Sequence, residues 1–470
     1  MKAYTPDEPI AAIATALAPS ALSIIRLSGK DCIELLSRVF SRPSALKEAQ
    51  GNTIVYGWIV DGATRIDEVL VSVFHSPKSY TGEEMAEISC HGGIKPVTSI
   101  FNLLLKNGFR QAERGEFTFR AFINGKTDLT KAEAVREIIE SKTDASRGLA
   151  AGRLSGNLAS EINDIKEKII STIASIEVEI EYPEDEENFA DTFDDTQLRE
   201  VRNRLEDLSA SWKSQKLYQD GARVILAGKT NAGKSSLFNA LLKEERAIVS
   251  DIEGTTRDWI ESWVSFDGIP ARLFDTAGLR ETEDVIEKRG VQMTYDLTKD
   301  ADVIIYLIDS TLNSDTENED VMFLCQQKVP VVIVFNKIDK INSDKLIHLN
   351  SDSRNSDKKT VFISAKTGQG MSDLIASVKE KLTSNVDTTE RLQAGLGSER
   401  QKKAVDEALD SVTHALAVAH GESEDFGDEI SLDAVVQDLE DALSFLSEIT
   451  GEVTPDDILG NIFANFCVGK

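Results

Sequence analysis

Five short stretches in the middle of this chain combine glycines, hydroxyl groups, lysines and carboxylates, the groups that can hold phosphates and a metal ion. They lie beside apolar runs that are typical of buried strands. Because ligands bind where parallel strands end, stretches that follow successive strands meet at one edge of a sheet. The five therefore predict a single site for a charged ligand. In chain order they are Gly228–Ser235, Gly254–Asp258, Asp275–Gly278, Asn336–Asp339 and Ser364–Lys366.

The first stretch fits the pattern G-x-x-x-x-G-K-S of a phosphate-binding loop and follows the apolar run Arg223–Ala227. Its glycines let backbone N–H groups turn toward phosphate oxygens, and the helix that begins here adds its positive end. We expect Lys234 to reach the outer phosphates, in binding and in catalysis, and the Ser235 hydroxyl to bind Mg²⁺. The rest of the loop's predicted contacts are Asn231, Ala232, Gly233 and Ser236.

The second and third stretches predict a switch and a metal anchor. Asp275 ends the apolar run Ala271–Phe274, and its carboxylate can hold Mg²⁺ through water, while the N–H of Gly278 can meet the terminal phosphate. Thr255 and Thr256 lie in a polar loop. One of them is expected to close on Mg²⁺ when the γ-phosphate is present, so this loop is a predicted order–disorder switch.

The fourth and fifth stretches identify the base. Asp339 only accepts hydrogen bonds and can take both N–H groups on the edge of guanine, a pair that adenine does not offer. A site built for those bonds leaves buried groups unpaired when another base binds, so its discrimination is strong. The base pocket is completed by Asn336, Lys337, Ser364, Ala365 and Lys366. Together the five stretches predict a GTP site with Mg²⁺.

One catalytic position is different from the Ras-type pattern. There, a Gln after Asp-x-x-Gly orients the attacking water, whereas this chain has Leu279, which forms no hydrogen bond with its side chain. Fast hydrolysis therefore needs another water-positioning group and another positive charge. Asn231 offers a side-chain oxygen beside the phosphates that can hold a monovalent cation. The loop beyond Leu279 is acidic, and a plain solvated loop is the alternative interpretation of Glu281, Glu283, Asp284 and Glu287.

The composition limits the possible classes of function. The chain has 470 residues and a formal net charge of −28. The length predicts about three domains, and the charge argues against a protein that coats nucleic acid. The 4 cysteines have no C-x-x-C spacing, which indicates neither a zinc knuckle nor a disulfide framework. There is no signal-peptide layout and no apolar run near the ~20 residues that span a membrane, so we expect a cytoplasmic protein.

Hydrophobic periodicity divides the chain into four segments. Residues 1–127 mix short apolar runs with turn signals and predict a small α/β domain, and residues 128–217 are helical. Residues 218–384 alternate strands and helices, as a doubly wound, mostly parallel sheet of the Ras-like P-loop type requires. Residues 385–470 are helical again. We expect the nucleotide domain to be inserted into a discontinuous helical domain; the alternative is two helical segments that each pack on their nearest neighbour.

Particular elements follow from the same patterns. Apolar residues from Leu154 to Ile180, spaced by three or four, predict one long helix that ends at Tyr182-Pro183. A second stripe from Leu432 to Leu446 predicts another helix, and Thr454–Asp457 has the residues of a helix start. Further predicted strands cover residues 22–27, 69–74, 303–308, 331–335 and 361–363, and further predicted helices cover residues 31–40, 95–106 and about 195–215.

These residues together resemble the MnmE/TrmE family of tRNA-modification GTPases over essentially the whole chain. Val468 stands where the family's terminal motif usually has Ile, which is a minor difference. The motifs that carry the resemblance, besides the phosphate loop and Gly254–Asp258, are Ser79–Glu84, His91–Gly93, Gly115–Thr118, Arg120–Phe122, Asn124–Lys126, Asp128–Thr130, Asp275–Arg280 and Phe466–Lys470.

The resemblance implies a function. Such proteins act with a flavin (FAD)-dependent partner of the MnmG/GidA type, in a heterotetramer, to add an aminomethyl or carboxymethylaminomethyl group to the wobble uridine of certain tRNAs. The N-terminal domain is expected to pair two copies into a homodimer and to bind 5-formyltetrahydrofolate or methylenetetrahydrofolate as one-carbon donor. The family pattern maps the folate contacts to Arg26, Glu87, Lys126 and Lys470.

Simpler roles remain open for several of these residues. A structural ion pair is the alternative for Arg26, and a turn residue is the alternative for Lys126. Cys467 lies in the terminal motif and is assigned a catalytic role by the resemblance, whereas a small packed residue in a docking segment is the alternative. His91 has a hydrogen-bonded structural alternative in the same way.

The resemblance also accounts for Leu279, because the family's GTPases are activated by potassium and by pairing of two nucleotide domains, without an arginine finger. By that pattern Glu287 orients the water, Thr256 binds Mg²⁺, and potassium is held by Asn231, Ser250, Ile252 and Thr255. Arg280 is the rival source of positive charge. The remaining nucleotide contacts implied by the resemblance are Asp251, Glu253, Gly254, Thr276 and Ala277.

Two other functions fit the nucleotide site. One is a regulatory GTPase whose outer domains only recruit partners. Folate binding by the N-terminal domain would exclude this function. The other is an RNA-binding scaffold for ribosome assembly. The acidic charge and the absence of an evident basic, aromatic-interleaved patch in the sequence count against this last function.

Overall fold

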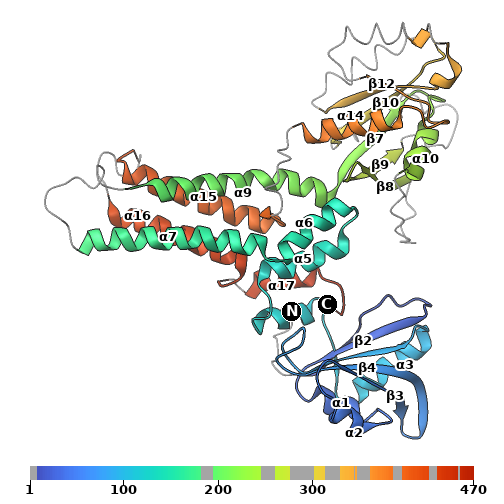
Figure 1. Ribbon diagram of the computed structural model, residues 1–470, viewed down its shortest axis with the longest axis vertical. Coiled ribbons are helices and arrows are strands. Elements are labelled where there is room, and N and C mark those ends of the chain that lie inside the picture. The colour runs from blue at the N-terminus through green and yellow to red at the C-terminus, as the bar shows by residue number, and fades with distance from the viewer. Residues whose placement is uncertain are drawn as a thin grey trace. The chain divides into compact units, whose positions relative to one another are not determined.

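The computed structural model describes residues 8–181, 194–244, 260–275, 301–312, 329–342, 345–346, 360–384, 394–422, 431–453 and 456–469. The chain forms two compact units, each built from separate stretches of sequence (Figure 1). The first comprises Met1–Arg136, Leu154–Arg202 and Lys403–Lys470, and the second comprises Glu137–Arg153 and Asn203–Lys402. Among the described helices, none is long and apolar enough to cross a membrane.

The N-terminal part of the first unit is a six-stranded sheet in the order β3-β4-β5-β2-β1-β6. Its neighbours are antiparallel except for β1 and β6, which run parallel. The alternation of buried and exposed residues along β3 and β5 shows that one face packs on a core with α1 and α3. The elements are β1 Ile10–Ile13, β2 Leu22–Ser28, α1 Cys32–Ser37, α2 Pro43–Lys47, β3 Thr53–Asp61, β4 Thr64–Phe74, β5 Met85–His91, α3 Ile94–Lys106 and β6 Arg110–Gln111.

The predicted strands at 22–27 and 69–74 are present, within β2 and β4, and α3 matches the helix predicted at 95–106. The helix predicted at 31–40 is shorter, because α1 ends at Ser37 and Phe40 instead forms an isolated bridge with Ile59. Phe40 is 3% exposed, so the chain leaves the helix to bury an aromatic ring against the sheet.

The helical part of the first unit combines elements from before and after the second unit. Helix α7 packs against α16, and Lys166 of α7 forms an ion pair of 2.6 Å with Glu452, just beyond α16. Asp195, at the start of α9, meets His420 after α15 at 2.8 Å. Helices α5, α9 and α15 are shared with the second unit, and α6 belongs to the second unit except for Leu154. The helices are α4 Glu116–Ile123, α5 Leu129–Glu140, α6 Asp144–Leu154, α7 Asn157–Glu181, α9 Thr196–Asp220, α15 Glu399–Ala419, α16 Leu432–Thr450 and α17 Asp456–Ala464.

The apolar stripe predicted as one helix belongs to two. Leu154 is the last residue of α6, and the chain turns at Gly156, whose φ of 102° is the left-handed conformation that favours glycine, before α7 begins. The stripe from Leu158 to Ile176 is buried, whereas Leu154 and Ile180 are 38% and 39% exposed. The helix expected near Thr454 begins at Asp456; Thr454 and Pro455 lie outside the described residues, as does the acidic segment after Glu422.

The second unit contains a six-stranded sheet in the order β12-β11-β10-β7-β9-β8. All neighbours are parallel except the hairpin of β8 and β9. The parallel strands were expected; β8 was not, because the adjacent apolar residues Trp263 and Val264 break a strict polar–apolar alternation, although Val264 and Phe266 both lie in the core. The elements are β7 Ala222–Gly228, α10 Lys234–Glu244, β8 Ile260–Phe266, β9 Ile269–Asp275, β10 Val303–Asp309, β11 Val331–Asn336, the short 3₁₀ helix Ile338–Lys340, β12 Thr360–Phe362 and α14 Met371–Thr383.

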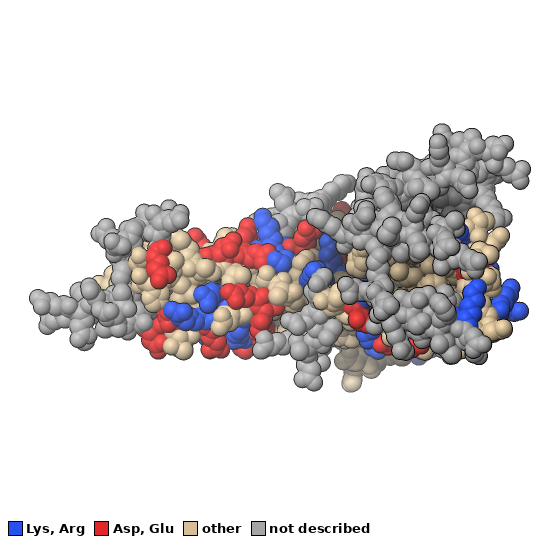
Figure 2. Space-filling model, turned by 90° about the horizontal axis from the view of Figure 1, so that it is seen from above, with Lys and Arg blue, Asp and Glu red and all other residues tan. Residues whose placement is uncertain are grey.

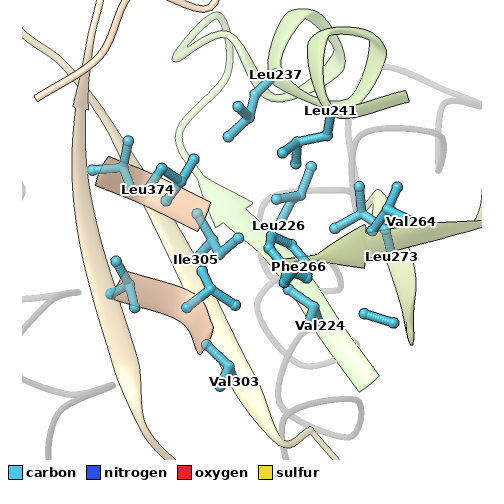
Figure 3. Close-up of a cluster of buried hydrophobic side chains, with 14 of the residues drawn as sticks. Val224, Leu226, Leu237, Leu241, Val264, Phe266, Leu273, Val303, Ile305 and Leu374 are labelled. Atoms are coloured by element: carbon cyan, nitrogen blue, oxygen red, sulfur yellow. The ribbon is translucent and has the colours of Figure 1, made fainter. Parts of the chain in front are cut away.

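The core of this unit lies between the sheet and the helices α10 and α14 (Figure 3). Leu226 of β7 and Ile305 of β10 contribute from the sheet, and Leu237, Leu241 and Leu374 contribute from the two helices. All five are at most 1% exposed. This packing fixes the carboxyl ends of the parallel strands, where the predicted nucleotide residues begin.

The surface reflects the acidic composition. Figure 2 shows acidic and basic side chains interspersed along the long helices on the visible face. Interspersed charges favour solubility more than attraction of a polyanion. A nucleic-acid contact on this part of the chain would therefore need a local basic site or a basic partner.

Candidate functional site: a nucleotide pocket and an arginine-centred cluster

The phosphate loop joins the end of β7 to the start of α10. Gly228 has a φ of 137°, and a Cβ atom there would lie 2.4 Å from the Leu307 carbonyl, so only glycine fits against β10. The ammonium of Lys234 is folded back on the loop and donates to the carbonyls of Gly228 and Lys229 at 2.7 and 2.9 Å. Asn231, Ser235 and Ser236 are exposed at the mouth of this loop.

Asn336, the last residue of β11, joins three of the predicted stretches. Its amide nitrogen donates to the Ala232 carbonyl at 2.9 Å, and its amide oxygen accepts from the N–H groups of Lys337 and Ala365 at 2.8 and 3.1 Å. The side chain reaches the phosphate loop because Gly233 has no Cβ, which would lie 2.2 Å from the Asn336 amide nitrogen. Asn336, which is 2% exposed, therefore ties the base-recognition segments to the phosphate loop.

Asp339 and Ser364 meet where the base is expected. The Ser364 hydroxyl donates to Asp339 Oδ1 at 2.7 Å and accepts from the Thr367 N–H at 3.2 Å. The carboxylate thereby has a fixed orientation with Oδ2 available to a further donor. This fits the predicted bidentate acceptor, and Lys366 follows in the same loop.

Asp309, the last residue of β10, is a part of this site that sequence reasoning missed. Its Oδ2 forms an ion pair of 2.6 Å with Lys337, whose ammonium also donates to the Asn231 carbonyl at 2.7 Å. Burial tends to raise the pKa of the Asp309 carboxyl, but the hydrogen bonds from Lys337 and Thr311 outweigh it and hold this pKa below its ordinary value. The signal was present, because Asp309 follows an apolar strand in the same way as Asp275.

Asp275 is the last residue of β9 and pairs in register with Leu226 of β7, two residues before Gly228. The backbone therefore places the predicted metal anchor beside the phosphate loop. The Asp275 side chain lies outside the described structure, and so do Leu279 and the rival cation Arg280. The same holds for the remaining residues predicted to contact nucleotide, potassium or water: Ser250, Asp251, Ile252, Glu253, Gly254, Thr255, Thr256, Thr276, Ala277, Gly278 and Glu287. Among the described residues, no cluster of His, Cys, Asp or Glu has the arrangement of a metal site.

In the first unit, Arg26 of β2 is the centre of a second cluster. Its guanidinium forms an ion pair with Glu87 of β5 at 2.8 Å and donates to the Gly469 carbonyl at 2.9 Å. The rings of Tyr80 and Phe117 lie 5.5 and 5.8 Å from its charged carbon. The Arg26 and Glu87 side chains are only 18% and 23% exposed. An aromatic ring, a fixed carboxylate and a guanidinium on the face of a sheet can receive a planar heterocycle.

The other residues predicted for this cluster are only partly described. Lys126 is exposed and donates to the Pro77 carbonyl at 2.9 Å, in the same loop as Tyr80. Lys470 lies outside the described residues, but its neighbour Gly469 is held by Arg26. The terminal segment is also anchored by a bridge between Arg114 and Val468. The structure thus brings Arg26, Glu87 and the chain end together and places Lys126 on the adjoining loop.

Cys467 is exposed, whereas Cys32 and Cys90 are buried. Burial raises the pKa of the Cys90 thiol to about 11, and burial likewise raises the pKa of Cys32. These two thiols are therefore unreactive near neutral pH. Among the described cysteines, Cys467 alone is accessible for chemistry.

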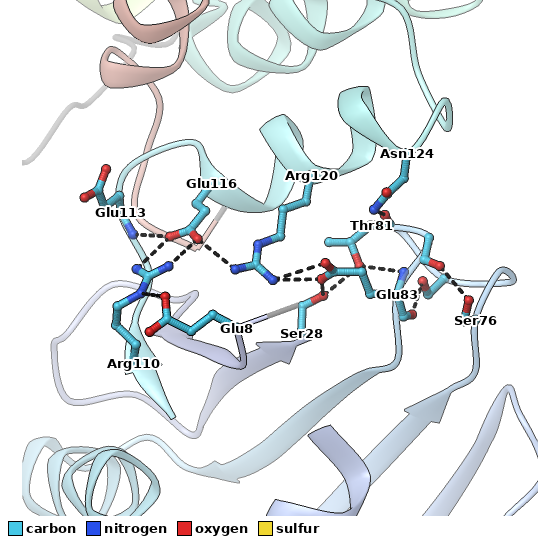
Figure 4. A network of polar contacts seen from close by, with 12 residues as sticks. Glu8, Ser28, Ser76, Thr81, Glu83, Arg110, Glu113, Glu116, Arg120 and Asn124 are labelled. Carbon is cyan, nitrogen blue, oxygen red and sulfur yellow. Dashed lines mark hydrogen bonds and ion pairs between the residues drawn. The ribbon is translucent and has the colours of Figure 1, made fainter. Parts of the chain in front are cut away.

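A buried ionic network supports the loop that carries Tyr80 (Figure 4). Arg120 of α4 is fully buried and pairs with Glu83 at 3.0 Å and with Glu116 at 2.9 Å. Glu116 also pairs with Arg110 at 2.6 Å. Burial tends to raise the pKa of the Glu116 carboxyl, but the bonds from Arg110, the Glu113 N–H and Arg120 outweigh it and lower this pKa. The network fixes the loop 76–84 against α4.

Known proteins resemble this chain along its whole length. The family model described as the MnmE helical domain matches residues 129–467, and that described as the GTP-binding protein TrmE N-terminus matches residues 9–126. A tRNA modification GTPase MnmE from Treponema denticola is 50% identical over 476 residues, which cover 99% of each chain. The corresponding protein of Carboxydothermus hydrogenoformans is 41% identical, over 99% of this chain and 100% of its own. The solved G domain of the Thermotoga maritima FeoB iron transporter is 28% identical over 35% of this chain and 99% of its own, with a TM-score of 0.25.

Proposed function

The chain belongs to the MnmE family of tRNA modification GTPases, and from this premise we propose that it couples GTP hydrolysis to the modification of the wobble uridine of certain tRNAs. Membership implies GTP hydrolysis with Mg²⁺, which agrees with the residues at the ends of β7 and β11. The proposal adds an FAD-dependent partner of the MnmG/GidA type, a heterotetrameric assembly, and an aminomethyl or carboxymethylaminomethyl group as the product on tRNA.

The Arg26 cluster is the observation that carries the proposal beyond hydrolysis. A switch that only recruits partners does not need a guanidinium, a carboxylate and an aromatic ring placed together at the chain terminus. Arg26 already bonds Glu87 and Gly469, so we propose that it orients Glu87 to accept the N–H groups of a pterin, while Lys126 and Lys470 meet the folate's carboxylates. A tetrahydrofolate bound there, 5-formyl or methylene, would supply the one-carbon unit.

Binding of 5-formyltetrahydrofolate to the full chain tests this proposal. Isothermal titration should give a saturable affinity that falls at least about tenfold in Arg26→Gln, which removes the charge that orients Glu87. Arg65→Gln is the matched control, because Arg65 stacks on the Trp58 ring at 5.0 Å elsewhere in the same sheet. No binding by the folded wild type would leave the regulatory GTPase as the better description.

We also propose that two copies pair through the N-terminal sheet. The face opposite α1 and α3 exposes apolar side chains: Ile54 at 65%, Tyr56 at 49% and Leu70 at 45% on the paired strands β3 and β4, and Leu22 at 65% at the start of β2. An exposed apolar group of this kind supports an interaction surface. A chain with a net charge of −28 repels its own copy, so pairing through exposed apolar side chains is favoured over pairing through its acidic surface.

Sedimentation of Ile54→Asp should show a monomer where the wild type sediments as a dimer, because the carboxylate would be buried without a partner. Ile170→Asp on α7, where Ile170 is 52% exposed, should leave the dimer intact. Dimers in both variants would place the pairing surface elsewhere.

Potassium activation completes the proposal. Asn231, at the exposed mouth of the phosphate loop, would contribute a side-chain oxygen, with Ser250, Ile252 and Thr255 as further ligands and Glu287 orienting the water. Leu279 stands where the Ras-type pattern has its glutamine, so hydrolysis needs another water-positioning group and another positive charge. Potassium would supply that positive charge. Pairing of two nucleotide domains is the expected active state.

A further inference from the structure

The ammonium of Lys337 connects three segments that are distant in the sequence. It lies 2.6 Å from Oδ2 of Asp309 at the end of β10 and 2.7 Å from the carbonyl oxygen of Asn231 in the phosphate loop. Lys337 itself follows Asn336 at the end of β11, and Asp309 and Asn336 are direct partners in the β10–β11 pair. One ion pair therefore links two strand ends to the loop that receives the phosphates.

Both backbone ends of this link have an unusual conformation. Asn231 has a φ of 65° and Lys337 a φ of 67°, and they are two of five non-glycine residues with positive φ in the described part of the chain. Such conformations cost of order 1–3 kcal/mol and persist only where the surroundings impose them. The bond from the Lys337 ammonium to the Asn231 carbonyl joins the two positions directly, so each helps to fix the other.

Burial and hydrogen bonds fix the orientation of the Asp309 carboxylate. The residue is 8% exposed, and its second oxygen, Oδ1, accepts from the Thr311 N–H at 2.9 Å and from the Thr311 hydroxyl at 2.6 Å. Because Thr311 holds Oδ1, the position of Oδ2 is fixed, and Oδ2 in turn fixes the position of the Lys337 ammonium. A partly buried, hydrogen-bonded pair of this kind is stronger than a surface ion pair.

We propose that Asp309 is a positioning residue for the phosphates of GTP and GDP, acting through Lys337 on the backbone of Asn231. If Asp309 loses its charge, the Lys337 ammonium loses its ion pair and is held less firmly at the phosphate loop. Asn231 can then leave its left-handed conformation more easily. The phosphate loop would then lose the shape that its bound phosphates require. The consequence falls on the β-phosphate, since the base is held separately by Asp339 and Ser364.

Asp309→Asn tests the proposal, because it keeps the shape of the side chain and removes its charge. We expect the Kd for GDP to rise about tenfold, which is 1.4 kcal/mol, while the Kd for GMP, which lacks the β-phosphate, changes less than about twofold. Competition against a fluorescent GDP gives both values. The measurement is made in sodium and needs no hydrolysis, so it succeeds or fails independently of the proposed potassium, folate and tRNA functions.

Two further variants separate positioning from general damage. Asp267→Asn removes an ion pair of the same length, 2.6 Å to Lys379, at the turn between β8 and β9, and should leave both affinities unchanged. Asp309→Glu keeps the charge and should recover most of the GDP affinity. Equal losses for GDP and GMP in a folded Asp309→Asn protein, or a GDP affinity equal to that of the wild type, would overturn the assignment.

Discussion

At the scale of single residues, the site depends on side chains that serve two segments at once. Asn336 donates to the phosphate loop and accepts from Ala365, and Lys337 reaches Asn231 and Asp309. The sequence motifs predicted Asn336 and Lys337 because few residue types can bind guanine and phosphate at these positions. Asp309 was missed although it ends an apolar strand as Asp275 does, because its contact across the sheet with Lys337 is not written in any pattern along the chain.

Asp339→Asn should change which base binds. The carboxylate, oriented by Ser364, accepts two N–H groups from guanine, whereas an amide offers one donor and one acceptor. GDP affinity should fall about 100-fold or more, and xanthosine diphosphate, which presents a carbonyl at that edge, should bind in its place. Competition binding with both nucleotides measures the exchange. If the variant still preferred GDP over xanthosine diphosphate, Asp339 would not be the base-reading group.

At the scale of elements, periodicity predicted the parallel strands and the long helices, and it failed where tertiary contacts decide. The helix predicted at 31–40 ends at Ser37, since Phe40 is needed against Ile59, and the stripe from Leu154 divides at Gly156. Strand β8 lies at the edge of its sheet, where it pairs with β9, and its adjacent apolar residues Trp263 and Val264 break the alternation that would have predicted it. The Arg26 cluster needs β2, β5, α4 and the chain terminus together, which no local pattern contains.

Glu116→Gln should remove a charge that folding favours. The folded-state pKa of Glu116 lies below its ordinary value of 4.5, so its contribution to stability is present above that value and is lost as the pH falls through the folded-state pKa. At pH 7 the variant should be less stable by about 1–3 kcal/mol, and the deficit should shrink as the pH falls below about 4.

Hydrogen exchange at the Glu113 N–H, which donates to Glu116 at 2.8 Å, gives a local measure of this effect. Glu48→Gln, at an exposed position on the same domain, is the control and should show no deficit. A deficit of the same size at neutral and acidic pH would mean that shape, and not charge, is what Glu116 contributes.

Leu439→Ala should weaken the packing of α16. Leu439 is 0% exposed on the helix that packs against α7, so the cavity and the lost contacts should cost about 2–5 kcal/mol. The helical part should unfold at lower urea in this variant than in Leu443→Ala, since Leu443 is only half-buried on the same helix. Equal shifts of the two midpoints would show that Leu439 does not anchor this interface.

At the scale of the whole molecule, the chain contributes Glu137–Arg153 to the second unit, leaves the first unit again within α9 at Asn203, and returns to it within α15 at Lys403. The helical stripes before and after the nucleotide domain suggested this connection, and the contacts of α7 with α16 and of Asp195 with His420 give it a physical basis. The boundaries at 127, 217 and 384 stay a proposal. The proposed pairing surface could not be predicted from the sequence, because an apolar residue in a strand gives the same pattern whether it faces a core or a partner.

The central claim is that this chain is a potassium-activated GTPase of its family, and GTP turnover in potassium against sodium at equal ionic strength tests it most directly. We predict stimulation by potassium of about tenfold or more, because the cation supplies the missing positive charge. Asn231→Ala and Glu287→Ala should each abolish the stimulation, and Asp267→Asn should retain it. Equal turnover in the two salts would contradict the account and would make Arg280 the first group to examine as the source of that charge.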